Sequence, residues 1–86
     1  MEIYFYFKDD CHLCDQMAKE LQHFVSGPGA GFDMSIISRD IEDNESWLCK
    51  YREYVPLLVA NGQEVCHYFF DEQEMLEVLN TQSPPK

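Results

Sequence analysis

The chain has 86 residues, which suits one domain, and 45% of them are hydrophobic and 14% aromatic, a composition that favours a packed globule over disorder. The formal net charge of -10 repels nucleic-acid phosphates and anionic lipid, so we expect neither nucleic acid nor a membrane as a partner. No run approaches membrane-spanning length, and the apolar residues 3–7 are too few for a signal-peptide core. We therefore expect a cytoplasmic protein, in a reducing compartment where four cysteines are typical of catalytic, metal-binding or buried thiols.

The first half of the chain predicts a strand, a helix and a second strand. Residues 3–7 are β-branched and aromatic without apolar–polar alternation, which is typical of a central strand covered on both faces. Beyond them, apolar side chains recur at helical spacing on a stripe formed by Cys14, Met17, Ala18, Leu21 and Val25. The glycine-rich residues 27–31 end this helix, and residues 32–37 predict the second strand.

A β-hairpin is predicted in the second half. Residues 55–60 and 63–69 predict strands, and Asn61-Gly62 between them is a typical two-residue hairpin turn. With the helices, the order of elements is βαβ, α, ββ, α. A βαβ unit needs a right-handed crossover between parallel strands, whereas a hairpin is antiparallel. We therefore predict an α/β fold, with a small mixed sheet and helices on both faces, in a single domain of residues 1–86.

Two helices of the second half carry capping signals. Asp43 or Asn44 can cap a helix whose apolar residues are Trp47, Leu48 and Tyr51. Asp71 and Glu74 have the spacing of a capping pair at the start of the last helix, whose inward residues are Met75, Leu76 and Leu79. Residues 81–86 include two prolines and are expected to form a frayed tail.

Cys11 and Cys14 form a Cys-x-x-Cys motif where the first strand meets the first helix. A thiolate is the nucleophile in disulfide exchange, and the free N–H groups and dipole of a helix N-terminus stabilise negative charge. We therefore predict that Cys11 is the attacking thiol. Cys14 is one turn further along, on the apolar stripe, so we expect it to be more buried. Its predicted role is that of the resolving thiol, which closes an intramolecular disulfide and releases a trapped mixed disulfide.

The surroundings of the pair leave alternatives open. Lys8 favours a thiolate, whereas three carboxylates oppose it, those of Asp9, Asp10 and Asp15. Zinc sites also use this motif, but they need further ligands, and Cys49 and Cys66 are single cysteines on other predicted elements. The competing hypothesis is a non-catalytic binding module whose cysteine pair is idle or holds zinc.

Pro56 lies inside an otherwise apolar predicted strand, from which its missing N–H normally excludes proline. An X–Pro bond can be cis, and a cis bond here would expose the backbone of Val55 beside the sulfurs, ready to pair with an extended peptide or a thiol substrate. The alternative is a proline that starts an edge strand. We favour the functional interpretation because of the position of the cysteines.

This combination resembles the thioredoxin superfamily, in which a strand, Cys-x-x-Cys at a helix start and Val-Pro before a hairpin occur in this order. The size and Lys8, three residues before Cys11, are similar to glutaredoxins, and Cys-His-Leu-Cys followed by an acid is similar to short bacterial glutaredoxin-like proteins. The resemblance covers residues 3–79. It implies a thioredoxin fold with strand order 2-1-3-4 and the third strand antiparallel, dithiol exchange, and a cis bond before Pro56.

The resemblance also indicates how glutathione would bind. In glutaredoxins the lysine, the residue before the proline and a Gly-Gly-x-Asp segment hold glutathione, and the corresponding residues here are Lys8, Val55, Pro56 and Asp71. In place of the glycine pair, residues 69–72 read Phe-Phe-Asp-Glu, and the two bulky rings would crowd the close backbone approach that glycines allow. We expect no tightly bound cofactor. Glutathione remains a candidate reductant, although the two phenylalanines argue against a glutathione site of the glutaredoxin type.

The sequence thus predicts a glutaredoxin-like thiol–disulfide oxidoreductase in which Cys11 attacks and Cys14 resolves. Its expected partner is a protein thiol or disulfide, or glutathione, and we expect a monomer. The expected substrate-binding residues are Lys8, Val55, Pro56 and Asp71.

Overall fold

The computed structural model describes residues 1–82 of the chain. Its elements, in chain order, are β1 (Glu2–Phe7), α1 (His12–Ser26), β2 (Ser35–Asp40), the 3-10 helix η1 (Ile41–Asp43), α2 (Glu45–Tyr51), β3 (Leu57–Ala60), β4 (Gln63–His67) and α3 (Glu72–Gln82). The strands form one four-stranded sheet in the order β2-β1-β3-β4. β1 pairs parallel with β2, and β3 is antiparallel to both of its neighbours. The α/β class, the strand order and the antiparallel third strand are thus confirmed.

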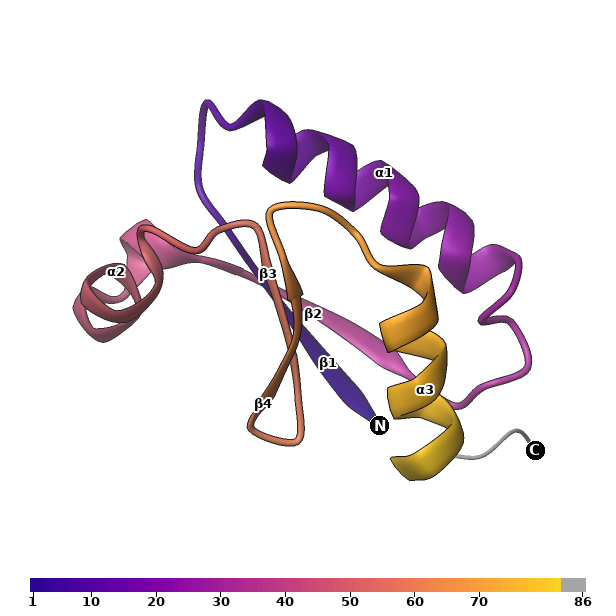
Figure 1. Ribbon diagram of the computed structural model, residues 1–86. Coiled ribbons are helices and arrows are strands. Elements are labelled where there is room, and N and C mark those ends of the chain that lie inside the picture. The colour runs from indigo at the N-terminus through magenta and orange to yellow at the C-terminus, as the bar shows by residue number, and fades with distance from the viewer. Residues whose placement is uncertain (83–86) are drawn as a thin grey trace.

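Helices cover both faces of the sheet, with α1 and α3 on one side and α2 on the other (Figure 1). Successive side chains of a strand point to opposite faces, so one strand serves two cores. The core under α1 and α3 includes Ile3, Phe5, Met17, Leu21, Phe24, Leu58, Ala60, Met75 and Leu79. The core on the α2 side is formed by Tyr6, Cys14, Ile41, Val55 and Leu57. β1 is therefore the central, two-sided strand that its sequence predicts, and each fully buried large apolar side chain contributes about 1.5–3 kcal/mol.

Arg39 of the edge strand β2 connects the sheet to α2. Its guanidinium carbon lies 4.1 Å from the centre of the Tyr4 ring and 4.8 Å from that of Trp47. The same side chain donates a 3.0 Å hydrogen bond to the hydroxyl of Tyr6. None of the residues of α2 is fully buried, and the helix meets the sheet through this stacking and through the rings of Trp47 and Tyr51, which contact that of Tyr6.

The second strand begins three residues later than its sequence predicts. The N–H of Phe32 donates to the carbonyl of Gly29 at 3.1 Å, so the glycine-rich turn extends through residue 32. Pairing with β1 begins where Ser35 lies opposite Glu2. The strand then continues to Asp40, because an edge strand has an exposed side on which polar residues are well tolerated.

The hairpin strands are shorter than predicted, although the turn is as predicted. Val55 and Pro56 precede β3, since a proline has no N–H to donate to the ladder. β4 ends at His67 because Tyr68 has a φ of 65°, in the left-handed region, and turns the chain away. Its N–H instead donates to the carbonyl of Pro56 at 2.8 Å. Between the strands, both turn residues have positive φ, 51° at Asn61 and 76° at Gly62, as a two-residue hairpin requires.

The helix caps confirm the sequence signals, and a few side chains correct them. Asn44 caps α2, where its side chain accepts from the N–H groups of Ser46 and Trp47, and the residues before it form η1, which was not predicted. Three residues placed on apolar helix faces are instead exposed, namely Ala18, Val25 and Leu48. α3 continues to Gln82, so residues 81–82 belong to the helix and not to a tail, while residues 83–86 lie outside the described chain. None of the helices within residues 1–82 is long and apolar enough to span a bilayer.

Candidate redox site

Cys11 occupies the N-cap position of α1, at the end of the loop that leaves β1. Its backbone is extended, with φ -125° and ψ 104°, and its Sγ accepts a 3.1 Å hydrogen bond from the backbone N–H of Cys14. The N–H of Asp15 donates to the carbonyl of Cys11 at 3.0 Å, which closes the first turn. A sulfur replaces the usual oxygen of an N-cap, and the positive end of the helix therefore faces it.

Cys11 and Cys14 are joined by a disulfide, with their Cα atoms 5.1 Å apart. Cys14 is buried, with 3% of its surface exposed, whereas Cys11 is half-buried. The expected difference in burial is therefore present. Cys11 is thus the more exposed of the two cysteines.

Val55 and Pro56 lie with the cysteine pair, although they are far from it in the sequence. The core on the α2 side contains both Cys14 and Val55, and Cys11 packs against this cluster. The Val55–Pro56 peptide bond is cis, and both residues are buried. The connection between β4 and α3 runs alongside, since the carbonyl of Pro56 accepts the N–H of Tyr68.

Lys8 and Asp71 are the other two residues that the sequence predicts to bind substrate. Lys8 is exposed in the loop between β1 and α1. The carboxylate of Asp71 accepts a 3.1 Å hydrogen bond from the N–H of Glu74, and its carbonyl accepts from the N–H of Met75. It is the cap of α3, as the spacing of Asp71 and Glu74 predicts, so its carboxylate already has a structural role.

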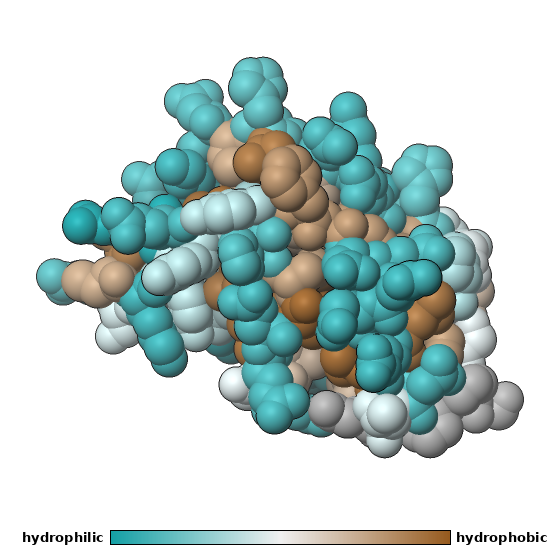
Figure 2. Space-filling model, viewed as in Figure 1, coloured by the Kyte–Doolittle hydropathy of each residue, from teal (hydrophilic) through white to brown (hydrophobic). Residues whose placement is uncertain are grey.

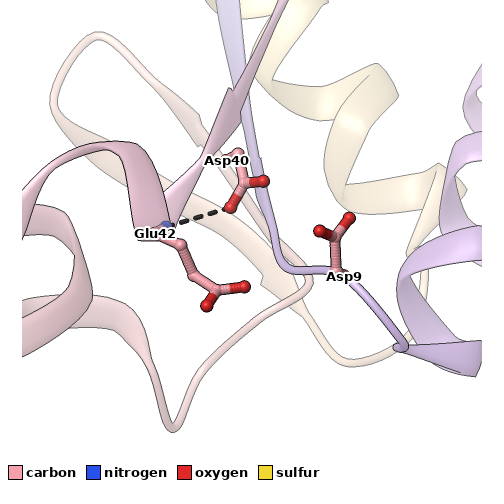
Figure 3. A group of neighbouring side chains, drawn as sticks. All are labelled: Asp9, Asp40 and Glu42. Atoms are coloured by element: carbon pink, nitrogen blue, oxygen red, sulfur yellow. Dashed lines mark hydrogen bonds between the residues drawn. The ribbon is translucent and has the colours of Figure 1, made fainter.

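Acidic side chains that the sequence does not place together converge beside this site. Asp9, Asp40 and Glu42 each have a carboxylate oxygen within 4.8 Å of the other two, and they project from two segments toward a common space (Figure 3). Asp40 also caps η1 by accepting the N–H of Glu42 at 2.9 Å. Asp9 was noted from its proximity to Cys11 in the chain. No sequence pattern predicts that Asp40 and Glu42 lie near Asp9, because the strand pairing of Phe7 with Asp40 is what brings them together.

Two surface hollows adjoin the cysteines. One, of about 190 Å³, is lined by Asp10, Cys11, His12 and Asp15. The other, of about 250 Å³, opens beside Cys14 and is mainly apolar. Its lining is Phe5, Phe7, Cys14, Asp15, Ala18 and Ser38. The surface around the two cysteines therefore combines carboxylates with an apolar recess.

The other two cysteines lie on separate elements, Cys49 exposed on α2 and Cys66 buried in β4. Burial raises the pKa of the Cys66 thiol. A hydrogen bond from the backbone of Asp71 lowers this pKa, and the negative charges of Asp71, Glu64 and Glu74 raise it. In residues 1–82, the one group of neighbouring Cys, His, Asp and Glu side chains suited to a metal is the carboxylate trio, which includes no cysteine.

Solved structures share this arrangement of elements. A protein of Nitrosomonas europaea, determined in solution by NMR, is 29% identical and has a TM-score of 0.67, over 88% of this chain and 87% of the other. A structural-genomics target protein of X. campestris is also 29% identical, with a TM-score of 0.68 over 92% and 96% of the two chains. Thioredoxin 1 of Thermosipho africanus is 19% identical, with a TM-score of 0.59 over 94% and 92%, and shares the fold.

The comparison with family models covers nearly the whole chain. A search of curated proteins finds no match. The family model of the glutaredoxin-like domain matches residues 2–80, from the first residue of β1 into the last turns of α3. The match includes both sulfurs of the disulfide and the cis peptide bond beside them, and the chain therefore belongs to the glutaredoxin-like domain family.

Proposed function

We propose that the protein is a cytoplasmic dithiol–disulfide oxidoreductase in which Cys11 attacks and Cys14 resolves. The observation that carries this proposal is the position of Cys11, a half-buried residue at the N-cap of α1 whose sulfur is bonded to Cys14. After reduction, the same backbone N–H and the helix dipole would act on a thiolate, which is the reactive form. The buried Cys14 has no such access and is suited to the intramolecular step.

The proposed reaction proceeds through one mixed disulfide. The Cys11 thiolate attacks a sulfur of the substrate disulfide, a new S–S bond forms, and the other substrate sulfur leaves as a thiolate that takes up a proton. Cys14 loses its proton and attacks the Cys11 sulfur, which closes the Cys11–Cys14 disulfide and releases the second substrate thiol. The substrate disulfide thus gains two electrons and two protons, and the protein dithiol loses them.

The cycle needs an external thiol reductant and no resident cofactor. A second dithiol, or two molecules of a monothiol such as glutathione, would reopen the disulfide by the same exchange chemistry. Two observations count against a glutaredoxin-type glutathione site. Phe69 is 66% exposed where glutaredoxins have glycine, and the carboxylate of Asp71 caps α3. We therefore propose a protein disulfide as substrate and a protein monomer as the acting unit.

Val55 is proposed to present its backbone to the substrate. It precedes β3, so it is not part of a strand, and it packs in the same cluster as Cys14. An extended substrate segment could pair with this backbone while its cysteine reaches the sulfur of Cys11.

Trapping the mixed disulfide tests the assignment of roles. Cys14→Ser should accumulate a covalent adduct with a disulfide-containing peptide at Cys11, and Cys11→Ser should not. Peptide mapping by mass spectrometry locates the adduct. Both variants should carry Cys49→Ser as well, because Cys49 is an exposed thiol that can form adducts of its own. Equal adducts in the two variants, or none in either, would contradict the proposed roles.

A further inference from the structure

The chemical class of the substrate can be inferred from the charges around the disulfide. We propose, on the basis of the proposed function, that the site selects protein disulfides whose cysteine is flanked by lysine or arginine, and that it disfavours anionic thiols such as glutathione. The surface responsible is an acidic rim, defined as Asp9, Asp10, Asp15, Asp40 and Glu42. It has two parts.

The first part of the rim comes from two segments that the sheet brings together. Asp9, Asp40 and Glu42 hold their carboxylate oxygens within 4.8 Å of one another (Figure 3). Ile41, between the two acids of the β2 end, is buried in the same cluster as Cys14 and Val55. The carboxylates of Asp40 and Glu42 are thus held on either side of a core residue that packs in the cluster of Cys14.

The second part surrounds the attacking sulfur itself. Asp10 and Asp15 line the hollow of about 190 Å³ that contains Cys11 and His12. Asp15 also lines the neighbouring hollow of about 250 Å³, whose other walls include Phe7 and Ala18. A mainly apolar hollow with a carboxylate among its lining residues suits a lysine or arginine side chain, because the aliphatic stem can lie on the apolar wall while the charged end meets the acid.

The cations described in residues 1–82 leave this rim without an ion pair. No lysine or arginine within residues 1–82 forms an ion pair with a rim carboxylate. Arg39, the neighbour of Asp40, is stacked on Tyr4 and Trp47 and hydrogen-bonded to Tyr6. Lys8 is the only positively charged side chain in the loop between β1 and α1. Glutathione has two carboxylates and one ammonium group, so it would bring net negative charge to a surface with little to pair it.

Exposed aromatic side chains lie near Pro56, whose carbonyl accepts the N–H of Tyr68. Around Pro56, three aromatic side chains are substantially exposed, namely Tyr54 at 49%, Tyr68 at 37% and Phe69 at 66%. Hydrophobic surface emerges over the connection between β4 and α3, among hydrophilic side chains (Figure 2). A tripeptide thiol would leave most of this surface uncovered, whereas a protein segment could contact the rim and the aromatic side together. Charge complementarity and this apolar area both favour a cationic polypeptide.

Matched probes separate this inference from the proposed function. Three peptides each contain one cysteine, which is blocked as a mixed disulfide with 2-thiopyridine. The cysteine is flanked by lysine in the first peptide, by glutamine in the second and by glutamate in the third. Glutathione blocked in the same way is the fourth probe. The reduced protein should release thiopyridone from the lysine peptide about tenfold faster than from the glutamate peptide, with glutathione near the slow end. The ratio should shrink toward one at high salt, where charges are screened beyond about 3 Å.

Substitution of the rim tests its location. Asp9→Asn, Asp40→Asn and Glu42→Gln together should reduce the ratio of lysine to glutamate rates severalfold. A control with the same charge change, Glu2→Gln, Glu64→Gln and Glu77→Gln, should keep the ratio. These residues lie on β1, β4 and α3, and the first two are near the end of the sheet opposite the cysteines.

The outcomes are distinct. If wild-type protein exchanges with the neutral glutamine peptide at the same rate as with the lysine and glutamate peptides, the substrate inference is wrong and the redox function stands. If no probe releases thiopyridone, the redox function is wrong and the inference falls with it. A preference for lysine that survives the three rim substitutions, whatever the control shows, would overturn the assignment to Asp9, Asp40 and Glu42.

Discussion

Replacing Arg39 tests how the face of the sheet beside the redox site is held together. Arg39→Ala removes stacking on Tyr4 and Trp47 and the hydrogen bond to Tyr6. Each cation–π contact at a partly exposed site contributes about 0.5–1 kcal/mol, and the hydrogen bond about 1 kcal/mol. We therefore expect the free energy of unfolding to fall by about 2–3 kcal/mol, which is a large share of the ~5–10 kcal/mol typical of a domain of this size.

Two control variants divide this effect. Tyr6→Phe loses the hydroxyl and keeps the stacking, so it should cost about 1 kcal/mol. Arg39→Lys keeps the charge and loses the planar guanidinium, so its cost should lie between those of Tyr6→Phe and Arg39→Ala. The double variant Arg39→Ala with Tyr6→Phe should cost less than the sum of the two single changes, because both remove the same hydrogen bond.

Urea denaturation followed by fluorescence is a direct assay. Trp47 is the only tryptophan of the chain and lies in contact with Arg39, so its emission reports on this contact as well as on unfolding. The disulfide should be kept oxidised in every sample. A change of less than about 0.5 kcal/mol in Arg39→Ala, the level of an ordinary surface substitution, would refute the view that this residue anchors α2.

Three further predictions concern local features. Asp71→Ala should lower the free energy of unfolding, measured by denaturation, by about 1 kcal/mol through loss of the α3 cap. If the rate of disulfide exchange falls by more than this free energy accounts for, the carboxylate also contacts the substrate. Burial raises the pKa of Cys66 above its ordinary value of 9.0, so the folded protein keeps this thiol neutral while the unfolded chain ionises it. Ionisation of this thiol should therefore have no effect on the free energy of unfolding below about pH 9, and the free energy should decline as the pH rises above that value. Cys66→Ala should flatten this decline, whereas Cys49→Ala should not. Gly29→Ala would place a methyl group 2.5 Å from a buried phenylalanine ring of α1 and should cost about 1–3 kcal/mol, whereas Gly31→Ala, with open space around it, should be nearly neutral in thermal unfolding.

The redox pair could be predicted because its geometry is local. In the sequence, Cys11 precedes an apolar stripe that includes Cys14, and a helix with that stripe places one sulfur at its start and the other one turn further on. The hairpin turn at residues 61–62 is local in the same way. Local spacing fixes such features whatever the rest of the chain does.

The acidic rim and the Arg39 contacts depend on tertiary packing instead. β2 is an edge strand with polar residues at its end, so its sequence has little strand signal, and its extent was predicted three residues too early. The parallel pairing of Phe7 with Asp40 decides which side chains meet Asp9. No short-range pattern encodes that register, and so the sequence showed the acids near Cys11 but not those from β2 and η1.

Redox equilibration tests the central claim most directly. Cys49→Ser protein is incubated in glutathione buffers that span the cytosolic range of about -200 to -320 mV, quenched with acid and analysed by intact mass and peptide mapping. The account predicts a reversible loss of two hydrogens that maps to Cys11 and Cys14, with little stable glutathione adduct. A pair that stays reduced at every ratio, or that purifies with a stoichiometric metal ion, would contradict it.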